Sequence, residues 1–128
     1  SNFAVDAASA IARAFGMTER FIGLTVVALG TSLPELFTSV SAAKKGNADI
    51  AIGNIIGSNI FNILFVVGVS ALIVPVPFSP EFIPDTVIAS AAGALLLVLS
   101  MAGKGKIKRL SGVLMLISYA VYFGFLCI

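Results

Sequence analysis

The stretch FIGLTVVALGTSLPELFTSVSAA, residues 21–43, holds a single charged residue, Glu35, in a run of otherwise apolar, small or hydroxyl-bearing residues. A helix needs about 20 mostly apolar residues to cross the hydrocarbon core of a membrane, and this run is long enough. Polar residues gather beside the carboxylate in the sequence GTSLPE, residues 30–35. We therefore predict a membrane-spanning helix with an ionisable group in its middle.

The composition of the whole chain also indicates a membrane protein. Of its 128 residues, 59% are hydrophobic and 11% are charged, and the mean hydropathy is +1.09. Soluble domains carry about 25% charged residues, so this chain has too few charges to cover a surface that faces water. The net charge is only +2, and the basic residues are not interleaved with aromatic ones, which argues against nucleic-acid binding.

The residue types used in catalysis are scarce. The sequence has no histidine, which is the commonest metal ligand and the usual general base near neutral pH. Its one cysteine, Cys127, allows neither a disulfide framework nor a CxxC site. We therefore expect no enzyme activity, no catalytic residues and no resident cofactor. Because the chain begins Ser1-Asn2 without an initiating Met, we expect it to be a piece of a longer protein.

Apolar runs predict four membrane spans, at residues 21–43, 50–74, 86–102 and 110–128. Residues 3–16 form an apolar helix too short to cross a membrane, which we expect to be the end of a preceding helix. A Lys-Lys-Gly-Asn turn, four prolines between residues 75 and 84, and a basic loop at 103–109 separate the runs. The predicted fold class is all-α: a polytopic membrane helix bundle, with a single transmembrane domain over residues 1–128.

The basic residues predict the orientation of these spans. Loops 44–49 and 103–109 lie on the same side of the membrane and together hold six lysines and arginines, whereas the opposite side has Arg13 and Arg20. Short loops rich in Lys and Arg face the cytoplasm. We therefore expect a multi-pass protein of the cell membrane with both loops cytoplasmic and the C-terminus outside.

Glu35 is the acidic residue that lies deep within a predicted span. A carboxylate at the centre of a membrane helix costs at least about 2–3 kcal/mol, so such groups usually serve a function. The alternative is a protonated or lysine-paired carboxyl that only holds helices together, but no basic residue of the chain lies at a matching depth. We interpret Glu35 as part of an intramembrane cation site.

Pro34 supports this interpretation. Proline has no N–H, so the carbonyl of Gly30 loses its helical partner, and the ring is expected to open that turn. A carbonyl freed at membrane depth needs another partner, and a dehydrated cation can serve as that partner. The Gly30 carbonyl and the hydroxyls of Thr31 and Ser32 together form a cluster of the oxygen ligands that Na⁺ and Ca²⁺ prefer. The alternative is an ordinary proline kink that Thr31 satisfies.

The second predicted span also carries polar residues. Asn54, Ser58 and Asn62 recur every four residues, so a regular helix places them on one face. Gly53 and Gly57 lie on an adjacent stripe, where they allow another helix to approach closely. These amides and hydroxyls line an ion site or, as the alternative, hold helices together by hydrogen bonds; we favour the site.

The motif GTSLPE at residues 30–35, followed across a short basic loop by GNIIGSN at 53–59, resembles the alpha-repeat of the sodium/calcium exchanger family, within the calcium/cation antiporters. The matching stretch covers residues 23–74. The resemblance implies ten helices in two inverted halves, with ions bound at mid-membrane between two such repeats. In this family the first repeat has the opposite orientation, so a basic loop predicted to lie inside implies that this repeat is the second. The resemblance therefore implies that the chain is the C-terminal half of an inverted-repeat cation antiporter.

The resemblance also implies a ligand set for the transported ions. Its members are the Ala28 carbonyl, Thr31, Ser32, Glu35, Ser58 and Asn62. The expected cargo is Ca²⁺ exchanged against Na⁺ by alternating access. The expected partners are the lipid bilayer and an N-terminal half with the first alpha-repeat, in the same chain or in a second one.

Two features of the sequence bear on the ions. Many sodium/calcium exchangers have Asp in one repeat where this chain has Asn62, so one negative charge is absent. The proton/calcium branch tends to carry Glu near Gly57, and this chain does not, which argues against proton coupling.

Two other functions stay open: a transporter of the same fold coupled to K⁺, Mg²⁺ or H⁺, and a helical membrane protein that transports nothing and uses its polar residues for assembly.

Single cysteines test the predicted orientation. In a Cys127→Ala background, cysteines at Lys45 and Lys106 should resist an impermeant thiol reagent added outside intact cells, because both loops face the cytoplasm. A cysteine at Glu81, in the opposite loop, should react. Labelling in the reverse pattern would assign the chain to the opposite orientation.

Overall fold

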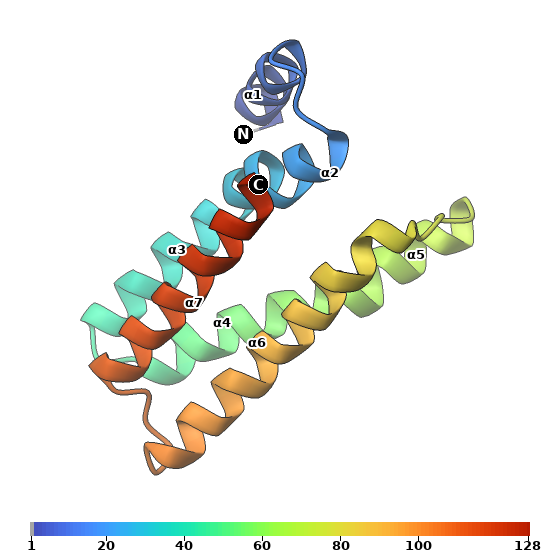
Figure 1. The fold of residues 1–128 in the computed structure, drawn as a ribbon. Coiled ribbons are helices and arrows are strands. Elements are labelled where there is room, and N and C mark those ends of the chain that lie inside the picture. Colours follow the sequence, from blue (N-terminus) through green and yellow to red (C-terminus); the bar gives the residue numbers. More distant parts are fainter. Residues whose placement is uncertain (1) are drawn as a thin grey trace. The chain divides into compact units, whose positions relative to one another are not determined.

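The computed structural model of the chain describes residues 2–128, and every regular element within them is a helix (Figure 1). In order these are α1 (Asn2–Ala14), α2 (Glu19–Ile22), the π-helical segment η1 (Gly23–Val27), α3 (Ala28–Lys44), α4 (Ala48–Ile60), the π-helical segment η2 (Phe61–Val66), α5 (Val67–Ile73), the 3₁₀ turn η3 (Pro80–Phe82), α6 (Ile83–Ala102) and α7 (Arg109–Cys127). The predicted all-α fold class is confirmed.

Several of these elements join into longer helices. Within the described residues, four continuous helical stretches are long and apolar enough to cross a membrane: Glu19–Lys44, Ala48–Ile73, Pro80–Ala102 and Arg109–Cys127. Each begins earlier than the apolar run from which we predicted it. The first turn of a helix has N–H groups without helical partners, so it accepts proline and charged residues such as Pro80, Pro84 and Arg109.

The chain divides into two compact units within the proline-rich connection, between Val76 and Pro77. The second membrane-length helix ends at Ile73, and Val74 after it is extended (φ −143°, ψ 137°). Proline disfavours helix for itself and for the residue before it, which explains the end of regular structure here. The prediction of a single transmembrane domain over residues 1–128 stays a prediction.

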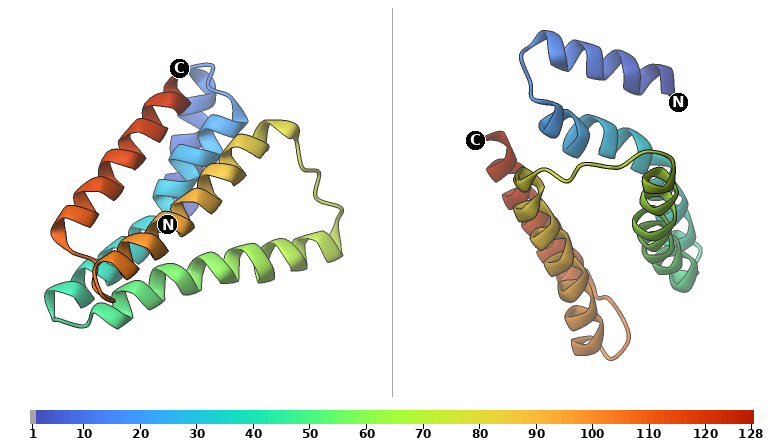
Figure 2. Two further views of the ribbon diagram at one scale, coloured as in Figure 1. Left: turned by 60° about the horizontal axis from the view of Figure 1, so that its bottom comes forward. Right: turned by 90° about the vertical axis from the view of Figure 1, so that its right-hand side faces the viewer.

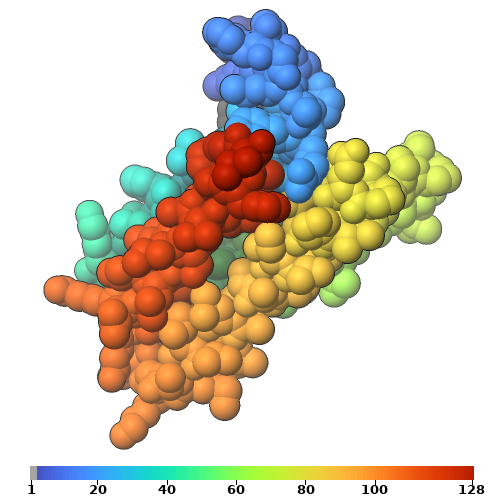
Figure 3. All heavy atoms as spheres, viewed as in Figure 1, coloured from blue at the N-terminus to red at the C-terminus, as the bar shows by residue number. Residues whose placement is uncertain are grey.

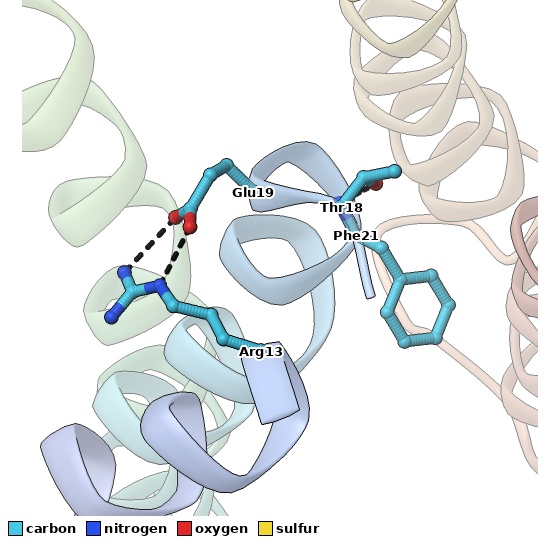
Figure 4. A network of polar contacts seen from close by, with 4 residues as sticks. All are labelled: Arg13, Thr18, Glu19 and Phe21. Atoms are coloured by element: carbon cyan, nitrogen blue, oxygen red, sulfur yellow. Dashed lines mark hydrogen bonds and ion pairs between the residues drawn. The ribbon is translucent and has the colours of Figure 1, made fainter. Parts of the chain in front are cut away.

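In the first unit, α1 is joined to α2 by a tight turn that carries an ion pair (Figure 4). The Arg13 guanidinium donates from Nε to Glu19 Oε1 (2.6 Å) and from Nη2 to Glu19 Oε2 (2.9 Å). The hydrogen bond to Glu19 raises the pKa of Arg13 above its usual value. Thr18 Oγ1 accepts from the Phe21 N–H (3.2 Å) and so caps α2. The ion pair links the end of α1 to the start of α2.

Small side chains let α1 pack against α2 and η1. Ser9 and Ala12 of α1 are buried, as are Ile22 and Thr25 on the segments that α1 contacts. Gly30 lies one element further, and a Cβ atom there would be only 2.6 Å from Val5 Cγ2. A side chain at position 30 would require the Val5 side chain to rotate or α1 to shift, so the glycine of the GTSLPE motif lets α1 lie close to α3.

Helices α3 and α4 form an antiparallel hairpin with a three-residue turn. Gly46 has φ +81°, and after it the Asn47 N–H donates to the Ala42 carbonyl (2.9 Å), which closes the end of α3. The buried residues of the hairpin, Ser39, Ala42 and Ala51, are all small, so the two backbones approach closely next to the turn. In Figures 1 and 2 the two helices diverge as they leave it.

The second unit consists of η3, α6 and α7. The Tyr122 hydroxyl, near the end of α7, donates to Asp85 Oδ1 near the start of α6 (3.3 Å). Both helices expose large apolar side chains along their length, including Met101, Leu116 and Val121; the side-chain atoms of both helices are visible in Figure 3. Such a surface suits contact with lipid or with further helices rather than with water.

The turn of the hairpin gives a stability prediction. Gly46→Ala places a Cβ atom on a left-handed residue, which costs about 1–2 kcal/mol, so the midpoint of thermal unfolding in detergent should fall. Gly93→Ala is the matched control, because Gly93 lies in the middle of α6 with open space around it. Alanine there should leave stability unchanged or raise it slightly. Equal midpoints for both variants would contradict the role of Gly46.

Candidate ion-binding site

Glu35 lies on the face of α3 that packs against α4. It is one helical turn before the buried Ser39, and its side chain is half-buried. Its Oε2 atom is shielded from solvent and has no hydrogen-bond partner among the described residues. A buried carboxylate oxygen without a donor is costly, because ionised groups need compensation when they leave water. Glu35 therefore presents an acceptor that a cation can satisfy.

Asn54 of α4 reaches across the hairpin to the same turn of α3. Its amide Nδ2 donates to the Glu35 backbone carbonyl (3.2 Å) and to Ser39 Oγ (3.1 Å). Ser39 Oγ in turn donates to the Ala51 carbonyl (3.3 Å). The amide nitrogen thus joins the two helices, as in the alternative interpretation of this polar face. A part for Asn54 in lining an ion site stays a prediction.

Helix α3 runs without a break through Pro34, so the predicted opening of that turn is wrong. Pro34 still cannot donate to the Gly30 carbonyl, but the surrounding backbone keeps α-helical geometry. The irregular backbone lies earlier, in η1, which ends directly before Ala28. The neighbouring hydroxyl does not satisfy Gly30 either, since Thr31 Oγ1 donates to the carbonyls of Val27 (2.9 Å) and Ala28 (3.2 Å).

The predicted ligands on α3 lie along two turns of that helix. Ala28, Thr31 and Ser32 are exposed, and Glu35 follows one turn later on the half-buried side. The Ala28 carbonyl and the Thr31 hydroxyl are brought together by their hydrogen bond. Because Thr31 uses its hydrogen within the helix, the lone pairs of its oxygen remain available to a cation.

Ser58 of α4 continues the face that carries Asn54. Asn54 lies opposite Glu35, and Ala51 lies opposite Ser39, so the hairpin is antiparallel in a fixed register. One turn further from the loop, this register brings Ser58 to the level of Thr31. Ser58 is half-buried, and its Oγ donates to the Ile55 carbonyl of its own helix (3.1 Å). Its oxygen can also accept from, or coordinate, a third group.

Asn62 is the predicted ligand of the second span that lies furthest along the chain from the loop. It is exposed and sits in η2, two residues beyond the end of α4. The backbone is α-helical up to Phe61, whose N–H donates to the Gly57 and Ser58 carbonyls, so Asn62 keeps its four-residue spacing from Ser58 on one side of the helix. The wider turn of η2 comes later, where the Val67 N–H donates to the Asn62 carbonyl, and it rotates the residues that follow Asn62. The place of Asn62 in the ligand set stays a prediction.

Ser39 is a polar residue of the hairpin that the sequence interpretation missed. It lies four residues after Glu35, so helical spacing alone places both on one face of α3. That spacing could have predicted its location but not its partners, which belong to another helix. Within the described residues, no three Asp, Glu, His or Cys side chains form a group that could hold a metal ion. The oxygen donors near Glu35 are hydroxyls, amides and carbonyls.

Helices of membrane length, with a carboxylate and several hydroxyls inside one of them, define a multi-pass helical membrane protein with polar groups within its spans. The chain belongs to the sodium/calcium exchanger protein family, whose sequence model matches residues 1–128. The family resemblance inferred from the GTSLPE and GNIIGSN motifs is thus confirmed.

Individual relatives agree with this assignment. The chain is 44% identical to the CaxA protein of Alkalimonas amylolytica, over 95% of this chain and 39% of the relative. It is 37% identical to the sodium/calcium exchanger MaX1 of Methanosarcina acetivorans, over 95% of this chain and 35% of the relative. It is 35% identical to the sodium/potassium/calcium exchanger 1 of Gallus gallus, over 92% of this chain and 19% of the relative. The chain thus spans at most about two-fifths of the length of these relatives, and no solved structure shows a significant match to it.

Proposed function

We propose that this chain is the C-terminal half of a cation antiporter that exchanges Ca²⁺ against Na⁺ by alternating access. The observation that carries the proposal is the shielded Oε2 atom of Glu35, which has no hydrogen-bond donor among the described residues although Glu35 lies on a helix of membrane length. A charged group is held at such depth where it serves ion movement. Relatives named as sodium/calcium and sodium/potassium/calcium exchangers support the choice of ions.

The proposed ligands are oxygen atoms of the types that Ca²⁺ and Na⁺ accept. Thr31 and Ser58 each donate their hydroxyl hydrogen to a carbonyl of their own helix, so their lone pairs face outward. Glu35 supplies the negative charge. Ser32 and the Ala28 carbonyl belong to the same stretch of α3. In this proposal Asn62 joins the site from η2 when the second half of the transporter is in place.

One carboxylate cannot balance a divalent ion. A dehydrated Ca²⁺ ion in a low-dielectric site needs compensation of both charges, because each uncompensated charge there is expensive. Ca²⁺ also takes about 6–8 oxygen ligands, more than one hairpin directs at a single point. We therefore propose that a second, inverted repeat completes the site, in the same full-length chain or in a partner chain.

Alternating access requires that the site open to each side of the membrane in turn. In the proposed orientation, loops 44–49 and 103–109 face the cytoplasm and the C-terminus lies outside. Inverted repeats give a transporter two related conformations around one midplane site. The α3–α4 hairpin, with its turn on the cytoplasmic side, would contribute one wall of that site.

Glu35→Gln tests the proposal in the complete transporter reconstituted into proteoliposomes. The substitution keeps size and hydrogen bonding but removes the charge that balances Ca²⁺. Loss of one partner of a buried ion pair costs about 3–5 kcal/mol, so Ca²⁺ flux should fall by more than about a hundredfold. Glu81→Gln is the matched control, because Glu81 is exposed in η3 and should transport normally. Flux at the wild-type rate in Glu35→Gln would refute the site.

Asn62→Asp tests the contribution of η2. The change adds one negative charge with little change in size, and a ligand carboxylate binds these cations more strongly than an amide does. We expect tighter Ca²⁺ or Na⁺ binding, or a different charge moved per cycle, measured as current. Binding and current that both match the wild type would remove Asn62 from the proposed ligand set.

A further inference from the structure

We propose that Asn54 is a positioning residue for ion binding: it fixes the backbone of Glu35 against α4 and thereby sets where the carboxylate lies. The inference rests on the proposed function, because it concerns the same carboxylate. Asn54 itself is not a ligand in this proposal. Its role is carried by two hydrogen bonds from one amide group, to the Glu35 carbonyl and to Ser39 Oγ.

The chemistry of the acceptors fixes the orientation of the amide. A backbone carbonyl can only accept a hydrogen bond, so the atom of Asn54 that faces the Glu35 carbonyl must be the nitrogen. The amide nitrogen has two hydrogens, and its two contacts at 3.2 Å and 3.1 Å use both. Ser39, which receives the second, donates its own hydrogen to the Ala51 carbonyl. The chain of bonds therefore ties α3 to α4 at two successive turns.

Glu35 needs a hydrogen bond from another helix to fix its position, because few contacts within α3 hold it. Its Oε2 atom has no hydrogen-bond donor among the described residues, so side-chain contacts do not hold that end of the carboxylate. The preceding residue, Pro34, removes one hydrogen bond from the turn that leads to it. An ion site works only if its ligands stay within about 0.5 Å of their productive positions. The bond from Asn54 supplies that constraint at the Glu35 backbone.

The chain offers a control that separates positioning from general helix adhesion. Asn54→Ala removes two interhelical hydrogen bonds, those to the Glu35 carbonyl and to Ser39. Ser39→Ala also removes two, those with Asn54 and with the Ala51 carbonyl, but leaves the bond to the Glu35 carbonyl in place. The two variants lose the same number of interhelical bonds, so similar losses of thermal stability are expected.

The test measures the Ca²⁺ concentration for half-maximal flux, the maximal flux and the stabilisation of the purified complete transporter by Ca²⁺ without transport. Loss of a group that orients a metal ligand typically weakens affinity by about 10–100-fold, so Asn54→Ala should raise the half-maximal concentration by about tenfold or more. The stabilisation by Ca²⁺ should shift to higher concentration by the same factor. Ser39→Ala should change either quantity by less than about threefold, since the Glu35 bond survives.

Equal shifts in Asn54→Ala and Ser39→Ala would overturn the proposal, because they would mean that Asn54 only holds the helices together. An unchanged half-maximal concentration in Asn54→Ala would overturn it as well. If Asn54→Ala does not fold, Asn54→Gln takes its place: it keeps both donors, but its extra methylene displaces them, so the half-maximal concentration should still rise. A wild-type value there would also refute the inference. Failure of the proposed function is distinguishable, because it appears as normal flux in Glu35→Gln.

Discussion

The hydrogen bonds of the Asn54 amide across the α3–α4 hairpin are the constraint on which the rest of the site depends. Ala42 and Ala51 let the two helices approach closely, and the three-residue turn sets their register next to the loop. Further from the turn, the directional bond from Asn54 to the Glu35 carbonyl holds that register. Once that pairing is set, the levels of Thr31 and Ser58 follow from helical geometry.

Much of the fold could be predicted because membrane helices are governed by length and composition. Four apolar runs gave four helices of membrane length, and the breaks at Gly46 and at the prolines fall where backbone chemistry places them. The first residues of the helices were harder to predict, because residues such as Pro80 interrupt an apolar run but are compatible with the first turn of a helix. The sequence carries no signal for the division of the chain after Val76 other than the prolines themselves.

The site was predicted one helix at a time, and this explains which contacts the prediction missed. Periodicity places Glu35, Ser39 and Asn54 on faces, but it does not say which face meets which, so the bonds among them could not be foreseen. The interpretation also assumed regular helices. The π-helical segments η1 and η2 leave no signal in the hydrophobic periodicity, so the sequence did not predict them. Pro34 is visible in the sequence as a helix-breaking residue, but it does not interrupt α3.

The polar groups of the hairpin fall into two kinds according to where their hydrogens go. Asn54 and Ser39 donate their hydrogen bonds to the other helix of the hairpin, and these bonds hold α3 to α4. Thr31 and Ser58 donate to carbonyls of their own helices, so the lone pairs of their oxygens are left for another group. In the proposed ion site this division would be useful. The bonds that hold the two helices together would not compete with the ion, and the oxygens offered to the ion would not have to break a bond between helices to reach it.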